Sequence, residues 1–154
     1  MVSFRVGPIS YTVGRADFLG SFFDTIAVRL EDGSRGSRYP LLASLYTAGE
    51  LPSASAAVAR DELRAIVDAL SAFLPTDVVW DADDSTRRAP WGDEIAPSIV
   101  TLADYHVTAD GRRLHEVLDT ALDASARVER PLTLSSPPGI DQGVPGQTSA
   151  SPRA

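Results

Sequence analysis

Residues 16–31, which read ADFLGSFFDTIAVRLE, constrain the fold more than any other segment. Their large apolar residues recur at three- and four-residue spacing, which places the side chains on one face of a helix. Asp17 falls where the first turn would begin, and a carboxylate there can accept hydrogen bonds from the unpaired N–H groups of a helix start. We therefore predict a central helix whose buried face consists of Phe18, Leu19, Phe22, Phe23, Ile26 and Leu30.

Three further segments predict helices. Residues 41–49 form a short apolar run that ends in glycine, a typical C-cap residue. A longer helix is expected from Ser53 or Ser55 to Phe73, because Pro75 stops it. Residues 112–128 carry a regular apolar face. The buried face of the helix that ends at Phe73 is expected to consist of Val58, Leu63, Ile66, Val67, Leu70, Phe73 and Leu74. The buried face of the helix at 112–128 is expected to consist of Leu114, Val117, Leu118, Ala121 and Leu122.

Shorter segments predict strands. Apolar and polar residues alternate within residues 2–13, where a Gly-Pro pair interrupts the pattern. Apolar runs at 77–80, 105–108 and 131–134 are expected to add short strands. The resulting order, β-α-α-α-β-β-α-β, predicts an α+β fold: a single domain in which a small, mostly antiparallel sheet packs with about four helices.

The composition changes after Leu134. Residues 135–154 read SSPPGIDQGVPGQTSASPRA, which is rich in proline, glycine and serine and has little to bury. Such a segment cannot offset the conformational entropy that ordering it would cost. We predict a domain over residues 1–134 and a disordered tail over residues 135–154.

Composition narrows the possible functions. The chain has no cysteine, which excludes disulfides, thiolate zinc sites and cysteine nucleophiles. Its net charge of −7 disfavours nucleic acid and anionic membranes as partners and favours a basic protein. The first residues lack the pattern of a signal peptide, and no apolar run approaches the about 18 residues of a membrane span. We expect a cytoplasmic protein.

The most prominent polar segment is VVWDADDSTRRAPWGDEI, residues 78–95. Carboxylate oxygens are ligands for magnesium and calcium. A calcium loop, however, needs glycine at its sixth position, where this segment has Thr86, and the following Arg87 and Arg88 oppose a bound cation. We therefore expect no metal and interpret the segment as a solvated or partner-facing loop. Its carboxylates are Asp81, Asp83, Asp84, Asp93 and Glu94.

No catalytic arrangement assembles elsewhere. His115 is followed by a glutamate, but the second histidine of a zinc helix is missing because Asp119 stands four residues on. His106 and His115 are expected to be packing or surface residues. No serine elbow occurs, and a chain without lysine has no phosphate loop. The segment GSRGSRYP, with Arg35 and Arg38, either cradles an anion or is a plain turn. We predict neither enzyme activity nor a cofactor.

The two tryptophans have different expected roles. Trp80 ends an apolar run and is expected in the core. Trp91 lies in a polar Pro-Trp-Gly turn, where an indole either anchors the loop or contacts a partner. An acidic domain with such a loop is typical of a protein-binding module.

Several segments also carry a family resemblance. DFLGSFFDTIAVRLE, GSRYPLLASLYTAGEL, VVWDADD, PWGDEI and YHVTADGRRL follow one another in this order over roughly residues 11–125. Together they resemble the immunity protein 70 family of bacterial polymorphic toxin systems; His106 stands where that family more commonly has an aromatic residue. The resemblance implies a non-enzymatic protein that binds and neutralises the C-terminal domain of a cognate toxin in the cytosol.

The resemblance implies no particular binding residues. From the sequence itself we hypothesise that Asp81, Asp83, Asp84, Asp93 and Glu94 form an acidic rim for a basic toxin domain, with Trp91 as an anchor. Two alternatives remain open. One is a metal-dependent enzyme that uses the carboxylates of residues 81–94, which specific metal uptake would reveal. The other is an adaptor or interaction domain without a toxin, which the neighbouring genes would distinguish.

Overall fold

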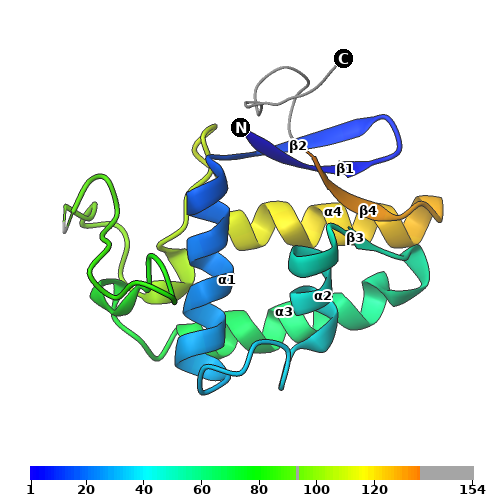
Figure 1. The fold of residues 1–154 in the computed structure, drawn as a ribbon. Coiled ribbons are helices and arrows are strands. Elements are labelled where there is room, and N and C mark those ends of the chain that lie inside the picture. The colour runs from blue at the N-terminus through cyan, green and yellow to red at the C-terminus, as the bar shows by residue number, and fades with distance from the viewer. Residues whose placement is uncertain (93, 136–154) are drawn as a thin grey trace, which may run out of the picture.

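The computed structural model describes residues 1–92 and 94–135. In this part of the chain, four α-helices pack with a four-stranded antiparallel sheet in one compact domain (Figure 1), which confirms the predicted α+β fold. The predicted disordered tail lies outside the described residues, except for its first residue, Ser135, which ends a strand.

The sheet has the strand order β2-β1-β4-β3. Its four strands are β1 (Val2–Val6), β2 (Ile9–Gly14), β3 (Glu50–Leu51) and β4 (Leu132–Ser135). The prediction of one interrupted strand over residues 2–13 is wrong, because β1 and β2 are two strands paired as a hairpin. Gly7 supplies the positive φ of 57° that the tight turn between them requires. The two-residue strand β3 was not predicted, whereas the strand at 131–134 is confirmed.

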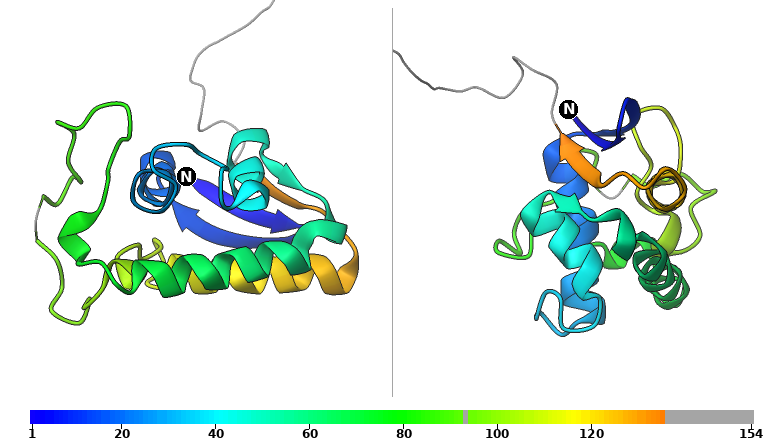
Figure 2. Two further views of the ribbon diagram at one scale, coloured as in Figure 1. Left: turned by 90° about the horizontal axis from the view of Figure 1, so that it is seen from below. Right: turned by 90° about the vertical axis from the view of Figure 1, so that its right-hand side faces the viewer.

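The helices form the rest of the domain. They are α1 (Ala16–Leu30), α2 (Pro40–Ala48), α3 (Ala56–Leu70) and α4 (Leu114–Val128). Helices α3 and α4 pack side by side in opposite directions, α1 crosses them, and the sheet lies on one side of the pair (Figures 1 and 2). No helix in the described part of the chain is long and apolar enough to cross a membrane.

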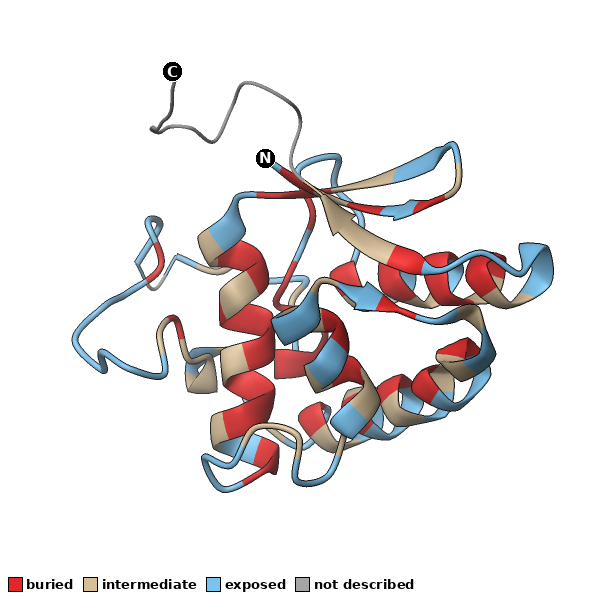
Figure 3. Cartoon of the chain, turned by 45° about the vertical axis from the view of Figure 1, so that its right-hand side comes forward, coloured by how far each residue is buried: buried red, intermediate tan, exposed pale blue. Residues whose placement is uncertain are grey.

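The predicted central helix is confirmed. All six apolar residues expected on the inner face of α1 are buried, as are the five expected on α4, and Figure 3 shows both buried faces turned into the same core. Helix α3 is confirmed with corrections: a 3₁₀ turn (Ser53–Ser55) precedes it, and it ends at Leu70. Val58 and Leu74, expected on its buried face, are 55% and 64% exposed.

Two predicted strands are wrong. Residues 75–77 form a 3₁₀ turn, and Val78 to Trp80 pair with no strand. Residues 105–108 contribute only an isolated bridge between Val107 and Arg113. Both segments are short and apolar, and a short apolar run does not distinguish a strand from another buried extended segment. In the first of these segments, side chains and not a neighbouring strand form the hydrogen bonds of the backbone. These side-chain contacts are part of the candidate site described below.

Candidate functional site

The acidic loop comprises residues 81–94, and its described residues, 81–92 and 94, lie beside α1 at one end of the molecule (Figure 1). Its backbone turns repeatedly without forming a helix or strand in the described residues. Its position therefore depends on side-chain contacts with α1.

The first of these contacts holds Val79, just before the loop. Ser21 and Thr25 stand one turn apart on α1, and both hydroxyl groups donate to the carbonyl oxygen of Val79, at 2.8 and 3.1 Å. Thr25 Oγ1 also accepts a hydrogen bond from the Val79 amide at 3.0 Å. The helix thus supplies the partners that a neighbouring strand would otherwise provide.

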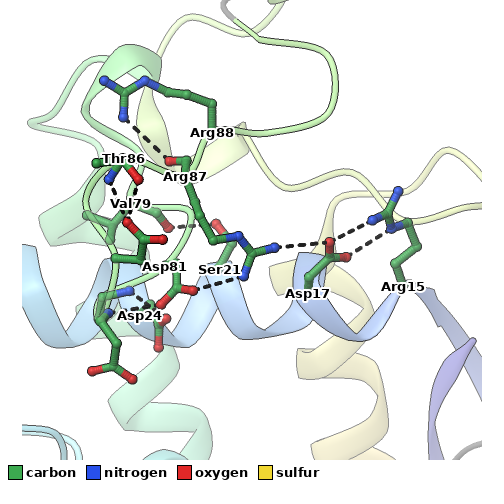
Figure 4. Close-up of polar contacts among 12 residues, drawn as sticks. Arg15, Asp17, Ser21, Asp24, Val79, Asp81, Thr86, Arg87 and Arg88 are labelled. Carbon is green, nitrogen blue, oxygen red and sulfur yellow. Dashed lines mark hydrogen bonds and ion pairs between the residues drawn. The ribbon is translucent and has the colours of Figure 1, made fainter.

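A second contact lies one step further along the chain. The Asp24 carboxylate on α1 accepts a hydrogen bond from the Ala82 amide at 2.9 Å and pairs through its other oxygen with Arg35. Arg29 donates to the carbonyl oxygen of Asp77 at 2.8 Å. The polar side of α1 therefore fixes the start of the acidic loop at several points (Figure 4).

Two of the predicted binding carboxylates are used within the loop. Asp81 pairs with Arg87 at 2.9 Å and accepts from the Asp83 amide at 2.9 Å (Figure 4). The backbone hydrogen bond and then Arg87 lower the pKa of Asp81. Asp84 accepts from the hydroxyl and the amide of Thr86, and these bonds lower its pKa. Asp81 and Asp84 shape the loop as well as adding charge to it.

Two other carboxylates are free to meet a partner. Asp83 and Glu94 are exposed, and neither side chain has a hydrogen bond or ion pair within the described part of the chain. Asp93, predicted with them, lies outside the described residues. The structure thus gives the four described carboxylates of the loop different environments.

Trp91 is both an anchor and an exposed surface. Its indole N–H donates to the Tyr105 hydroxyl at 2.9 Å, and its ring packs edge-to-face on Trp80 with centroids 5.4 Å apart. The Trp91 side chain nevertheless remains 41% exposed, whereas Trp80 is buried as predicted. A partner would meet an indole that is already held in one orientation.

The structure also contains a serine–histidine pair that the sequence did not indicate. His106 Nε2 lies 3.1 Å from Ser21 Oγ, and both residues are buried. Because the Ser21 hydroxyl donates to the Val79 carbonyl, we assign the proton of the shared bond to His106 Nε2. Burial lowers the pKa of His106 to about 3. A buried hydroxyl whose proton is already committed has no path to a substrate, so we interpret the pair as structural.

The segment for which the sequence left open an anion cradle or a plain turn encloses a carboxylate of the chain itself. The buried Glu31 carboxylate accepts hydrogen bonds from the amides of Gly36, Arg38 and Tyr39 at 3.0 to 3.1 Å. The turn is therefore more than a plain connection, because its amides bind an internal carboxylate. Among the described residues, no group of three or more His, Cys, Asp or Glu side chains could hold a metal ion.

Comparison with known proteins gives one family. A family model described as Immunity protein 70 matches residues 4–134, a range that contains all four α-helices and the acidic loop. Searches of curated proteins and of solved structures found no significant match. The resemblance seen in the sequence over residues 11–125 is confirmed over a longer range.

Proposed function

Since the chain belongs to the immunity protein 70 family, we propose that it neutralises a cognate bacterial toxin by binding the toxin's C-terminal domain directly in the cytosol. The family match carries this proposal. In it the chain acts by occupying a surface of the toxin and not by catalysis.

The acidic loop is the surface that we assign to the toxin. Asp83 and Glu94 present unpaired negative charge, and the contacts with α1 hold the start of the loop, next to Asp83, in place before binding. A toxin domain that acts on nucleic acid needs a basic face, and an acidic surface is attracted to such a face and can cover it. The net charge of −7 favours the same encounter.

The five carboxylates of the hypothesised acidic rim and the anchor Trp91 have different roles in this proposal. Asp83, Asp93 and Glu94 supply charge to the partner. Asp81 and Asp84 keep the loop in shape, and Trp91 supplies the apolar contact, because a rigid indole gains large contact area at low entropic cost.

Charge reversal tests the role of the loop. The double variant Asp83→Arg/Glu94→Arg should slow association with the toxin domain encoded directly upstream by about tenfold or more at low salt, and weaken its salt dependence. The measurement is binding kinetics at two ionic strengths.

A charge-matched control separates the loop from the net charge. Glu50 and Glu129 are exposed, unpaired within the described residues and outside the acidic loop. The double variant Glu50→Arg/Glu129→Arg changes the net charge equally and should slow association much less. Equal effects of the two double variants would refute the loop as the binding surface. Titration calorimetry with magnesium, calcium, manganese and zinc tests the alternative of a metal-dependent enzyme. Only that alternative predicts specific binding of one of these metals.

A further inference from the structure

A hollow of about 260 Å³ opens beside the acidic loop. Three separate parts of the chain build its apolar wall: α1, the end of the loop with the residues after it, and the segment before α4. The wall residues are Phe18, Trp91, Ile95, Ile99, Tyr105 and Val107.

The base of the hollow is buried, and its edge is exposed. Phe18 and Tyr105 are 6% and 4% exposed and belong to the core. Trp91 and Val107, by contrast, are 41% and 39% exposed. The hydrogen bond from the Trp91 indole to Tyr105 fixes one side of the edge of the hollow. Apolar surface that is exposed and held rigid is typical of the pockets that receive hot-spot side chains in protein interfaces.

The size of the hollow limits what it can hold. Sites for small molecules and cofactors usually enclose about 300–1,000 Å³. The hollow is smaller than this, so it suits one large side chain better than a drug-sized ligand.

The charge at the hollow indicates which kind of partner residue lies next to the inserted side chain. Among the described residues that line the hollow, Glu94 alone is charged, and its carboxylate has no partner in this part of the chain. An arginine or lysine beside the inserted side chain would pair with this carboxylate at the edge of an apolar contact, where water screens the pair less than on an open surface.

We infer that the hollow receives one large non-polar side chain of the toxin domain, and that an adjacent arginine or lysine of the toxin pairs with Glu94. This inference rests on the proposed function. It adds to it the chemistry of the toxin segment that binds: an apolar residue next to a basic one.

A charge placed at the exposed edge of the hollow tests the inference. Val107→Arg should raise the Kd for the upstream-encoded toxin domain at least tenfold, mainly through faster dissociation, because it sets a cation at the mouth of an apolar pocket and against the basic toxin residue. Val58→Arg is the matched control, since Val58 is an exposed valine on α3 outside the hollow. It should leave the Kd within about twofold of the wild-type value.

A second variant covers the case in which Val107→Arg does not fold. Ala96 is exposed and lines the hollow, so Ala96→Trp fills the space without removing an apolar contact. It should weaken binding as Val107→Arg does. Glu94→Gln should raise the Kd several-fold at low salt and less at high salt, because it removes only the charge.

The outcomes separate the inference from the proposed function. If the wild-type chain binds and the folded Val107→Arg or Ala96→Trp variant binds equally well, the inference is overturned and the proposed function stands. If Glu94→Gln binds as the wild type does at every salt concentration, the inferred pairing of Glu94 with an arginine or lysine of the toxin is refuted. If the wild-type chain does not bind the toxin domain, both proposals fail.

Discussion

At the scale of single residues, His106 is held neutral by its surroundings. The rings of Phe18, Phe22 and Tyr105 surround it with centroids 5.0 to 5.4 Å away, and its Nδ1 has no hydrogen-bond partner within the described residues. A charged imidazole would be expensive here, because nothing compensates for the lost hydration.

The His106→Phe variant tests this environment through pH. The folded protein lowers the pKa of His106 to about 3, so below the ordinary value of 6.5 the unfolded chain binds a proton that the folded chain does not. Stability is therefore lost as the pH falls from 6.5 toward 3, by about 2 kcal/mol between pH 7 and pH 5. The variant should lose less stability over this interval by about that amount, as urea unfolding at the two pH values would measure. Parallel pH dependences would show that His106 is not held neutral.

The sequence predicted some residue environments and not others. Trp80 was expected in the core because it ends an apolar run, and it is buried. The Ser21–His106 pair joins residues 85 positions apart, and neither residue lies in a motif that would have linked them. Pairing of Asp81 with Arg87 was likewise not predicted, because composition alone does not tell which charges in a loop neutralise one another.

At the scale of elements, α1 both fills the core and positions the acidic loop. Its apolar face was readable from spacing, because a long buried helix repeats its pattern over several turns. Its polar face was not readable in the same way: Ser21, Asp24 and Thr25 bind the backbone of residues 79–82, which the sequence presented as a strand and loop. Side-chain to backbone bonds replaced the expected strand pairing.

The Thr25→Val variant tests the contact between α1 and the loop. Valine keeps the branched shape and the low helix propensity of threonine but leaves the Val79 amide without its acceptor. We expect a loss of about 1–2 kcal/mol in the free energy of unfolding and faster hydrogen exchange at the Val79 amide. Thr120→Val on α4 is the control, since its exposed hydroxyl bonds only within its own helix, and it should change stability by less than about 0.5 kcal/mol. An unchanged Val79 exchange rate in Thr25→Val would contradict this role.

At the scale of the whole molecule, the fold class was predictable and its details were not. One domain of mixed helices and strands followed from chain length and periodicity, and the structure confirms it. The short edge strand β3 depends on pairing with β4, a distant segment, and a single sequence does not contain that information. The hairpin of β1 and β2 is local, but its Gly-Pro turn was mistaken for an interruption within one strand. The hollow beside the loop arises in the same way, from three parts of the chain that meet only in the folded protein.

The family match over residues 4–134 turns this geometry into a proposal about a partner. A compact domain holds an acidic loop and an exposed indole at one end, where both can meet a toxin domain without rearrangement of the core. Preformed surfaces of this kind lose little entropy on binding.

Co-expression of this chain with the toxin domain encoded directly upstream tests the central claim most directly. Growth of the cells would be scored first, and the two proteins would then be purified through a tag on one of them. We predict that the chain restores growth and that the toxin domain co-purifies with it in a stable complex. Continued growth inhibition without a complex, when both proteins are folded, would contradict neutralisation by direct binding.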